Sequence, residues 1–275
     1  MTSSGMRFLI SGVFWCMGLA LLYVPIVTLV AYSFVDTSSA SSAHEINLQA
    51  YRLLLDDQRL LPALRFSLSI AMASASLSLL LGAAAAIGVE RGRGFANAPK
   101  VRQLRSFESA ADAMTMLPVM LPEIVLGLGL LIWFLFLRIS LGSVSLVLAH
   151  VTFSVSYVFM TVRERIRILD VRLEDAAVDL GASPWCVFRK IQLPLMAPAL
   201  IGGWMMAFTL SFDDFLISFF TSGPDTATLP LALYSSIKFG VSPSVFAMAS
   251  LIFGVSFCSA SVLGRIFARR SASFV

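Results

Sequence analysis

Three carboxylates interrupt long apolar stretches of the sequence: Glu123, Asp213 and Asp214. A charge near the centre of a bilayer costs roughly 2.5 to 3.5 kcal/mol on insertion scales, so acidic residues there either pair with other groups or face a hydrated path. On such a path they would attract a cation. Asp214 shares a helical face with Ser211 and Ser218, which favours Asp214 as path-lining and places Asp213 at a seam between subunits. The alternative is that all three carboxylates are protonated or paired structural groups.

Aromatic residues accompany these carboxylates in the same apolar stretches. The candidates are Tyr157, Trp204 and Phe212, because a ring face attracts an organic cation and covers its methylene stem. Aromatic side chains also fill membrane-protein cores and form belts at the membrane interface, and for these three residues that structural explanation is the stronger one. The carboxylates and the aromatic residues together define a candidate substrate path.

Motifs for other chemistries are missing from the sequence. It contains no GxxxxGKS or GxxxxGKT phosphate loop, no HExxH zinc motif and no recognisable pair of nucleophile and base. The two histidines, His44 and His150, are expected to be structural or solvated rather than metal ligands. The three cysteines, Cys16, Cys186 and Cys258, are too dispersed for a disulfide framework. The chain is therefore not expected to be an enzyme, to hydrolyse ATP itself or to hold a metal.

The composition places these residues in a membrane. Of the 275 residues, 58% are hydrophobic and 13% are charged, and the mean hydropathy is +0.86, values that a soluble domain rarely reaches. Only helices and closed barrels satisfy their backbone groups in lipid, and continuous apolar runs of about 20 residues or more indicate helices. We therefore expect an all-α membrane protein with a single transmembrane domain over 1–275. Its six predicted spans cover about 8–35, 63–89, 113–137, 141–162, 195–220 and 243–267.

The distribution of Lys and Arg predicts the orientation of these spans. Most of the 20 basic residues fall at the two termini and in the loops over 90–112 and 163–194. The positive-inside rule therefore places both termini on the cytoplasmic side. The same clustering at helix ends explains the net charge of +4 without a nucleic-acid partner. The first span is too long for a signal peptide, so we expect it to be retained.

The cytoplasmic loop over 163–194 begins with a helical pattern. Leu173, Ala176, Ala177 and Leu180 recur at helical spacing. Gly181 follows directly and is placed to end this helix in a left-handed cap. The loop is therefore expected to contain a short helix and then a break.

A second short helix is expected after that break. Ser183 fits the N-cap position and Pro184 the first helical position, and Pro194 is expected to close the helix. Its apolar side chains are Trp185, Phe188 and Ile191. An apolar face outside the bilayer either packs on the protein's own loops or docks into another protein, and physical chemistry alone leaves both readings open.

The same loop resembles the EAA loop of permease subunits of binding-protein-dependent ABC importers. That pattern runs Glu-Ala-Ala, three residues, Gly, nine residues, Ile, one residue, Leu-Pro. Every spacing is met here by Asp175, Ala176, Ala177, Gly181, Ile191, Leu193 and Pro194. The one departure is Asp175, where the family has Glu; Glu174 stands just before it.

Further segments resemble the polyamine branch of these importers, and the putrescine permeases most of all. They lie at 118–123, 149–153, 203–214, 222–224, 228–231 and 241–243. The resemblance covers most of the chain from about 118 to 254. Before that region only the first two spans agree in outline.

This resemblance implies a type I ABC importer permease of the MetI-like fold, in a bacterial inner membrane. It implies a second permease subunit, in a heterodimer, two ATPase subunits, a periplasmic binding protein and a putrescine or spermidine cargo. ATP and Mg would be bound by the ATPase, and this chain would hold no cofactor. The EAA loop would form the coupling helix that enters a cleft on the ATPase. The residues implied in coupling are Glu174, Asp175, Ala176, Ala177, Gly181, Ser183, Pro184, Trp185, Phe188, Ile191, Leu193 and Pro194.

Two other functions are compatible with parts of the sequence. The same permease could carry another small cation or an amino acid, because nothing in the carboxylates selects a polyamine. An ATP-independent secondary transporter or channel would also need hydrated spans. Such a protein would need no docking loop, so the spacing from Asp175 to Pro194 argues against it.

Overall fold

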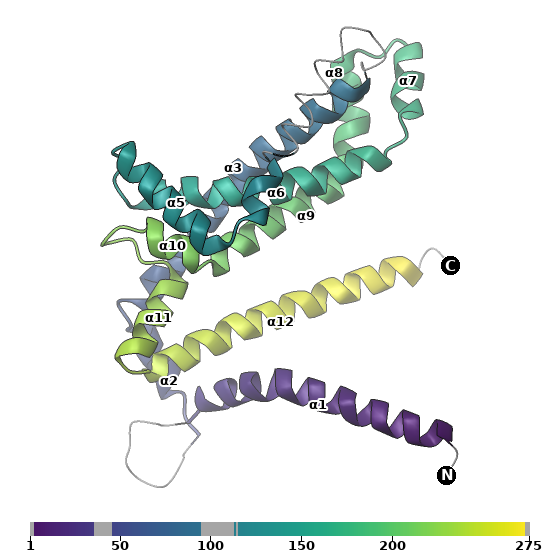
Figure 1. The fold of residues 1–275 in the computed structure, drawn as a ribbon. Coiled ribbons are helices and arrows are strands. Elements are labelled where there is room, and N and C mark those ends of the chain that lie inside the picture. Colours follow the sequence, from purple (N-terminus) through teal and green to yellow (C-terminus); the bar gives the residue numbers. More distant parts are fainter. Residues whose placement is uncertain (1–2, 36–45, 95–112, 114, 273–275) are drawn as a thin grey trace. The chain divides into compact units, whose positions relative to one another are not determined.

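The structure is a computed structural model that describes residues 3–35, 46–94, 113 and 115–272 (Figure 1). His44 and most of the 90–112 loop lie outside the described residues. The described chain is helical apart from short connections and one isolated antiparallel bridge between Val35 and Ile46. The predicted all-α class is therefore confirmed. The elements are α1 Ser3–Tyr32, α2 Gln49–Leu55, α3 Leu60–Gly94, α5 Glu123–Phe136, α6 Ser143–Ile168, α7 Arg172–Asp179, α8 Pro184–Val187, η2 Phe188–Gln192, α9 Leu193–Asp213, α10 Leu216–Thr221, α11 Leu229–Phe239 and α12 Pro243–Ala272.

Several described helices have the length and apolar character of membrane spans. Four are long and apolar enough to cross a bilayer: Gly12–Tyr32, Leu60–Glu90, Ser143–Ile168 and Pro184–Asp213. Two shorter apolar helices are Glu123–Phe136 and Pro243–Cys258. Each of the six predicted spans overlaps one of these helices, and the six-span topology stays a prediction.

Two predicted spans are not continuous helices. The span predicted over 113–137 is interrupted at Leu121 and Pro122, and Pro122 is extended with φ −57° and ψ 134°. Proline disfavours helical geometry in the preceding residue and lacks an N–H, which accounts for this break. The span predicted over 195–220 is interrupted at Asp214, which is also extended with φ −63° and ψ 127°. That break has no proline or glycine to explain it.

The helices form two compact units, which are described separately. The first contains Met1–Pro62 and Leu233–Val275, and the second contains Ala63–Ala232. In the first unit, the hydroxyl of Tyr51 on α2 lies 2.9 Å from the hydroxyl of Ser33 and 2.8 Å from that of Ser250 on α12. The rings of Tyr32 and Phe246 stack at 5.7 Å nearby. Hydroxyl pairs of this kind satisfy polar groups where little water is available.

Asp57 joins two further segments of the first unit. One carboxylate oxygen accepts the backbone N–H groups of Arg59, at 2.8 Å, and Leu60, at 3.0 Å, and the other accepts the Ser244 hydroxyl at 2.9 Å. Burial raises the pKa of the Asp57 carboxyl, but these hydrogen bonds and the Arg59 guanidinium outweigh burial and hold that pKa below its ordinary value. Asp57 therefore ties the start of α3 to the start of α12 as a charged group.

Small residues allow the helices of the second unit to pack closely. Ala71, Ser74, Ala75 and Ser78 lie on one face of α3, and all four are fully buried. At Gly82, one turn further along α3, an added Cβ would lie 2.9 Å from the Val155 carbonyl oxygen. This region of α3 therefore approaches the backbone of α6 directly.

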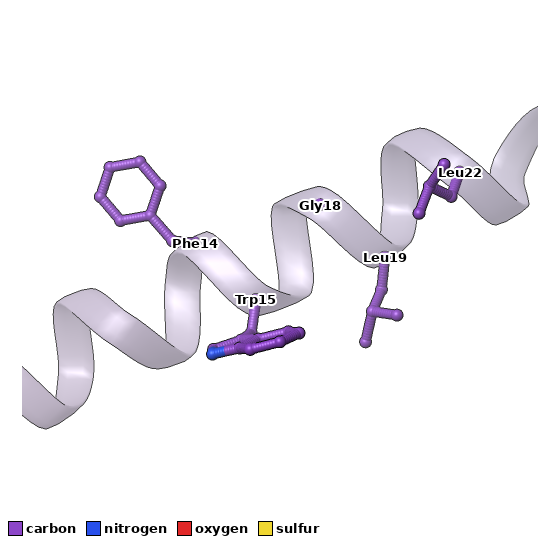
Figure 2. A pocket seen from close by; sticks show the side chains of 5 residues that line it. All are labelled: Phe14, Trp15, Gly18, Leu19 and Leu22. Atoms are coloured by element: carbon purple, nitrogen blue, oxygen red, sulfur yellow. The ribbon is translucent and has the colours of Figure 1, made fainter. Parts of the chain in front are cut away.

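The N-terminal helix α1 has a different character. No residue of its apolar stretch Gly12–Tyr32 is buried. A shallow hollow on this helix is lined by Phe14, Trp15, Gly18, Leu19 and Leu22 (Figure 2). All five residues belong to this one helix, and Trp15 is 72% exposed. The hollow is a gap between neighbouring side chains rather than a binding cavity. An apolar surface of this size belongs in hydrocarbon.

Candidate docking loop and substrate path

The first half of the loop over 163–194 has the predicted capped helix. Helix α7 ends before Gly181, whose φ is +82°. The Gly181 N–H donates to the Val178 carbonyl at 2.8 Å, and the Ala182 N–H donates to the Ala177 carbonyl at 3.0 Å. This pair of bonds is a Schellman motif, which ends a helix with one residue in the left-handed region. The predicted left-handed cap is confirmed.

The second half begins as predicted with a capped helix. Ser183 is extended, with φ −68° and ψ 153°, and its hydroxyl accepts the Cys186 N–H at 3.3 Å. Pro184 follows at the first helical position, where its missing N–H costs nothing. Gly181 and Ser183 together reverse the chain between two short helices.

The prediction that Pro194 closes this second helix is wrong. Helix α8 continues through a π-helical turn over Phe188–Gln192 into α9, which begins at Leu193. The Leu193 N–H donates to the Phe188 carbonyl, five residues back. Pro194 lies in the first turn of α9, where the wider π-helical turn accommodates a residue without an N–H. Helix α8, the π-helical turn and the long apolar helix α9 therefore form one continuous rod.

The apolar side chains of the loop are only partly covered. Trp185 is 67% exposed and stacks on half-buried Phe188 with 5.6 Å between ring centroids, and Ile191 is also half-buried. An apolar groove of about 500 Å³ separates this pair and Pro184 from α3. Helix α7 has no buried residue at all, and Leu180 beyond it is 89% exposed. The loop thus presents apolar surface that the described residues leave open.

The other predicted coupling residues lie around this surface. Asp175, Ala176, Leu193 and Pro194 are exposed, whereas Glu174 and Ala177 are half-buried. Within the part of the chain that the structure describes, neither acidic side chain has a hydrogen-bond or ion-pair partner. The structure therefore brings the predicted residues together on one loop without assigning a contact to the Asp175 carboxylate.

An ionic cluster that sequence reasoning missed anchors the base of this loop. Oε1 of Glu90, on α3, accepts Nε–H of Arg163 at 2.8 Å and Nε–H of Arg167 at 3.1 Å. The Arg163 side chain is 4% exposed and lies over the Phe159 ring at 5.3 Å. Arg165 donates to the Leu195 carbonyl at 2.9 Å. The ends of α3 and α6 and the start of α9 are therefore held together; the four-residue spacing of Arg163 and Arg167 was the one available signal.

The three membrane carboxylates occupy different surroundings. Glu123 is exposed at the start of α5, and Asp213 is exposed as the last residue of α9. Asp214 is buried, and its carboxylate accepts the N–H groups of Ile217, at 3.3 Å, and Ser218, at 2.7 Å. Because the helix breaks at Asp214, the predicted continuous face through residues 211, 214 and 218 does not form. The three side chains meet instead in a buried polar cluster.

His150 completes that cluster. The residue was expected to be structural or solvated, and its buried, hydrogen-bonded position agrees with the structural role. Its Nδ1 lies 2.5 Å from the Ser211 hydroxyl, and its Nε2 lies 3.1 Å from the Ser218 hydroxyl and 3.4 Å from Oδ2 of Asp214. The imidazole is fully buried. Sequence reasoning missed this partnership with Asp214, because 64 positions separate the two residues.

The candidate aromatic residues separate into two groups. Trp204 and Phe212 belong to one row on α9, with Phe208 between them; the ring centroids are 5.4 Å and 6.0 Å apart and the planes nearly parallel. The Trp204 indole N–H donates to the Ser76 hydroxyl at 3.3 Å. Tyr157 is half-buried against a different cluster, around Phe134. The aromatic row runs along α9 toward Asp213.

Comparison with known proteins supports a permease. Residues 78–273 match the family model described as binding-protein-dependent transport system inner membrane component. The chain is 38% identical to the Escherichia coli (strain K12) spermidine/putrescine transport system permease protein PotC over 237 residues, which cover 86% of each chain. It is 37% identical to the putrescine transport system permease protein PotI of the same strain, over 86% of this chain and 83% of PotI. The predicted resemblance to polyamine permeases is confirmed.

Solved structures share the fold at low sequence identity. A bacterial ABC transporter involved in the import of alginate matches with a TM-score of 0.72 and 14% identity, over 97% of this chain and 99% of that chain. The MetNI methionine ABC transporter matches with a TM-score of 0.59 and 15% identity, over 77% of this chain and 95% of that chain. These likenesses confirm an importer-permease fold. The chain belongs to the family of inner membrane components of binding-protein-dependent transport systems.

Proposed function

We propose that this chain is the membrane-spanning subunit of an ATP-driven polyamine importer, with putrescine or spermidine as cargo. The observation that carries the proposal is the docking loop, a pair of capped helices with an exposed Trp185, in a chain 38% identical to a spermidine/putrescine permease. Its partners are a second permease subunit in a heterodimer, two ATPase subunits and a periplasmic binding protein. In this proposal the chain crosses a bacterial inner membrane six times, with both termini on the cytoplasmic side.

The continuity of the docking helix with α9 indicates how the ATPase drives transport. ATP, with Mg, binds to the ATPase subunits, and their closure draws the two docking loops together. Because α8, the π-helical turn and α9 form one rod, displacement of Trp185 moves α9 as far as Asp213. The Arg165–Leu195 hydrogen bond makes the end of α6 follow α9, and the Glu90–Arg163 contact makes the end of α3 follow α6. The path then opens outward on ATP binding and inward after hydrolysis.

The proposed substrate path combines carboxylates with an aromatic row. A polyamine is a chain of ammonium groups joined by methylenes, so carboxylates pair with the ammonium groups while ring faces cover the stem. Glu123 and Asp213 are exposed on this chain, and Trp204 and Phe212 lie on the same helix as Asp213. Asp213 takes the path-lining role that the sequence analysis gave to Asp214, and Asp214 takes the structural role, because Asp214 is buried against His150. Tyr157 remains a candidate with no contact to the row.

Neutralising the path carboxylates tests the cargo. Glu123→Gln and Asp213→Asn keep the shape of the side chain and remove its charge, so each should raise the KM for putrescine uptake about five- to thirtyfold, or ~1–2 kcal/mol. Complex yield should stay normal, and the loaded binding protein should still stimulate ATP hydrolysis, because docking lies elsewhere. Asp56→Asn, at an exposed carboxylate outside the predicted spans, is the control. Parent KM values in both path variants would contradict a cation path and favour a structural role for these groups.

Cys186 offers a direct test of docking. It is half-buried on α8 beside exposed Trp185. With Cys16 and Cys258 replaced by serine, a bifunctional thiol reagent should link Cys186 to a cysteine placed in the ATPase cleft, with a yield that changes between nucleotide-free and ATP-bound states. Cys186→Ser should abolish the product. Links confined to the permease in every nucleotide state would show that this loop does not dock the ATPase.

A further inference from the structure

A chain of buried polar side chains crosses the second unit from α3 to α10. The Ser74 hydroxyl lies 2.8 Å from the Ile70 carbonyl oxygen and 2.8 Å from the Ser211 hydroxyl. Ser211 lies 2.5 Å from Nδ1 of His150, and Nε2 of His150 lies 3.4 Å from Oδ2 of Asp214. Each of these side chains is 9% exposed or less. Buried polar groups of this kind are stable only when their hydrogen bonds are satisfied together.

The hydroxyl hydrogens assign the proton on Nδ1. A carbonyl oxygen only accepts, so the single hydrogen of Ser74 is used by the Ile70 carbonyl. Ser211 must then donate to Ser74, which uses the single hydrogen of Ser211. The remaining contact requires Nδ1 of His150 to donate to Ser211. Nδ1 of His150 therefore carries a hydrogen.

The surroundings of Nε2 assign a second proton. The Asp214 carboxylate accepts two backbone N–H groups, of Ile217 and Ser218, which favours its charged, acceptor-only form. An unprotonated Nε2 could accept the Ser218 hydroxyl at 3.1 Å, but its lone pair would still lie 3.4 Å from Oδ2 of Asp214 with no hydrogen between those two atoms. A hydrogen on Nε2 removes this repulsion and pairs the two groups. With both nitrogens protonated, His150 is an imidazolium and Asp214 is its counter-ion.

We propose that His150 is a positioning residue that neutralises Asp214 and fixes the break between α9 and α10, so that Asp213 alone is left to meet the cargo. The Asp214 carboxylate caps the first turn of α10 while His150 on α6 holds it in place. This arrangement explains why the helix breaks at Asp214 without proline or glycine. The role of Asp213 toward the cargo rests on the proposed function, whereas the ion pair and the helix break do not.

The protonation of His150 can be measured directly, because the chain has only one other histidine. The full chain with His44→Gln, labelled with [15N]histidine and purified through a histidine-free tag, is studied in nanodiscs by solid-state NMR at neutral pH. We expect both ring nitrogens of His150 to show the protonated, imidazolium signature, and Asp214→Asn to convert the ring to the neutral form. One unprotonated ring nitrogen of His150 in the chain that keeps Asp214 would overturn the proposal. This measurement involves no polyamine, so it is independent of the cargo.

A charge-balanced double variant tests the positioning role. Asp214→Asn and His150→Gln each leave one partner without its counter-ion, and each should lower the yield of assembled complex at least tenfold. The double variant removes both charges and should recover yield to within about threefold of the parent. Asp213→Asn, by contrast, should assemble normally and raise KM. A double variant no better than the worse single, or an Asp214→Asn complex that assembles normally with a raised KM, would overturn the proposal.

Discussion

Replacing Gly181 with valine is expected to lower ATP-driven uptake about a hundredfold while the chain still inserts in the membrane. The φ of Gly181 is +82°, and no atom of the described residues other than its chain neighbours lies within 4 Å of the position where a Cβ would be added. Crowding by neighbours is therefore irrelevant, and backbone strain alone decides the effect. A β-branched residue in this region costs of order 1–3 kcal/mol, and the loop escapes that cost by abandoning the Schellman motif. Trp185 is then no longer presented to the ATPase at the angle that docking needs.

Asparagine at the same position is the matched control. Asparagine tolerates the left-handed region better than any β-branched residue, so Gly181→Asn should retain most of the uptake. The measurements are uptake, ATP hydrolysis stimulated by the binding protein, and co-purification of the ATPase. In Gly181→Val all three should fall together, with membrane levels of the permease unchanged. Parent-like uptake by the valine variant would show that the loop conformation is not required for coupling.

Replacing Gly82 with leucine should reduce the amount of assembled complex by a similar factor, for a different reason. An added Cβ at Gly82 would lie 2.9 Å from the Val155 carbonyl oxygen and 2.9 Å from Val158 Cβ. A backbone carbonyl inside a helix cannot move aside as a flexible side chain would. We expect a cost of about 3 kcal/mol, at the upper end of the usual range for overpacking, so α3 and α6 should separate.

Gly88 on the same helix provides the comparison for Gly82. It is exposed, and no atom lies within 4 Å of a Cβ added there. Thermal aggregation of the detergent-solubilised chain, followed by size-exclusion chromatography, should shift to lower temperature for Gly82→Leu and stay near the parent for Gly88→Leu. Equal melting of the two variants would mean that α3 and α6 do not pack as closely as described.

The docking loop could be predicted in detail because its signals are local. A left-handed glycine, an N-cap serine and a proline at the first helical position act through the few residues around them, and the structure contains all three. The end of the second helix was predicted wrongly at Pro194. The π-helical turn that lets α8 continue into α9 has no sequence signature at this position, and a proline alone suggested a stop.

The buried partnerships could not be predicted in the same way. His150 meets Asp214, and Glu90 meets Arg163, across 64 and 73 positions of sequence, so only the packed helices bring them together. The break at Asp214 depends on such a partnership and therefore had no local signal. The break at Pro122 differs, because a proline is a local feature that accounts for it, although the sequence analysis predicted a continuous span over 113–137.

These two kinds of feature divide the molecule by role. The locally encoded loop exposes apolar side chains such as Trp185 and Leu180, whereas the long-range pairs hold helices of this chain together. Changes to the loop should therefore affect coupling with little effect on assembly. Changes to the Glu90 cluster or to the His150–Asp214 pair should affect assembly before coupling.

Uptake by a reconstituted complex tests the central claim most directly. The chain is assembled in proteoliposomes with its partner permease and ATPase, ATP is supplied on the ATPase side, and binding protein loaded with labelled putrescine is added on the other. We predict accumulation above the equilibrium level that requires hydrolysable ATP, competes with spermidine and disappears with Gly181→Val. Equilibration of putrescine across the membrane that does not depend on ATP or on the ATPase would contradict this account. ATP-driven uptake of an amino acid without any uptake of putrescine or spermidine would also contradict it.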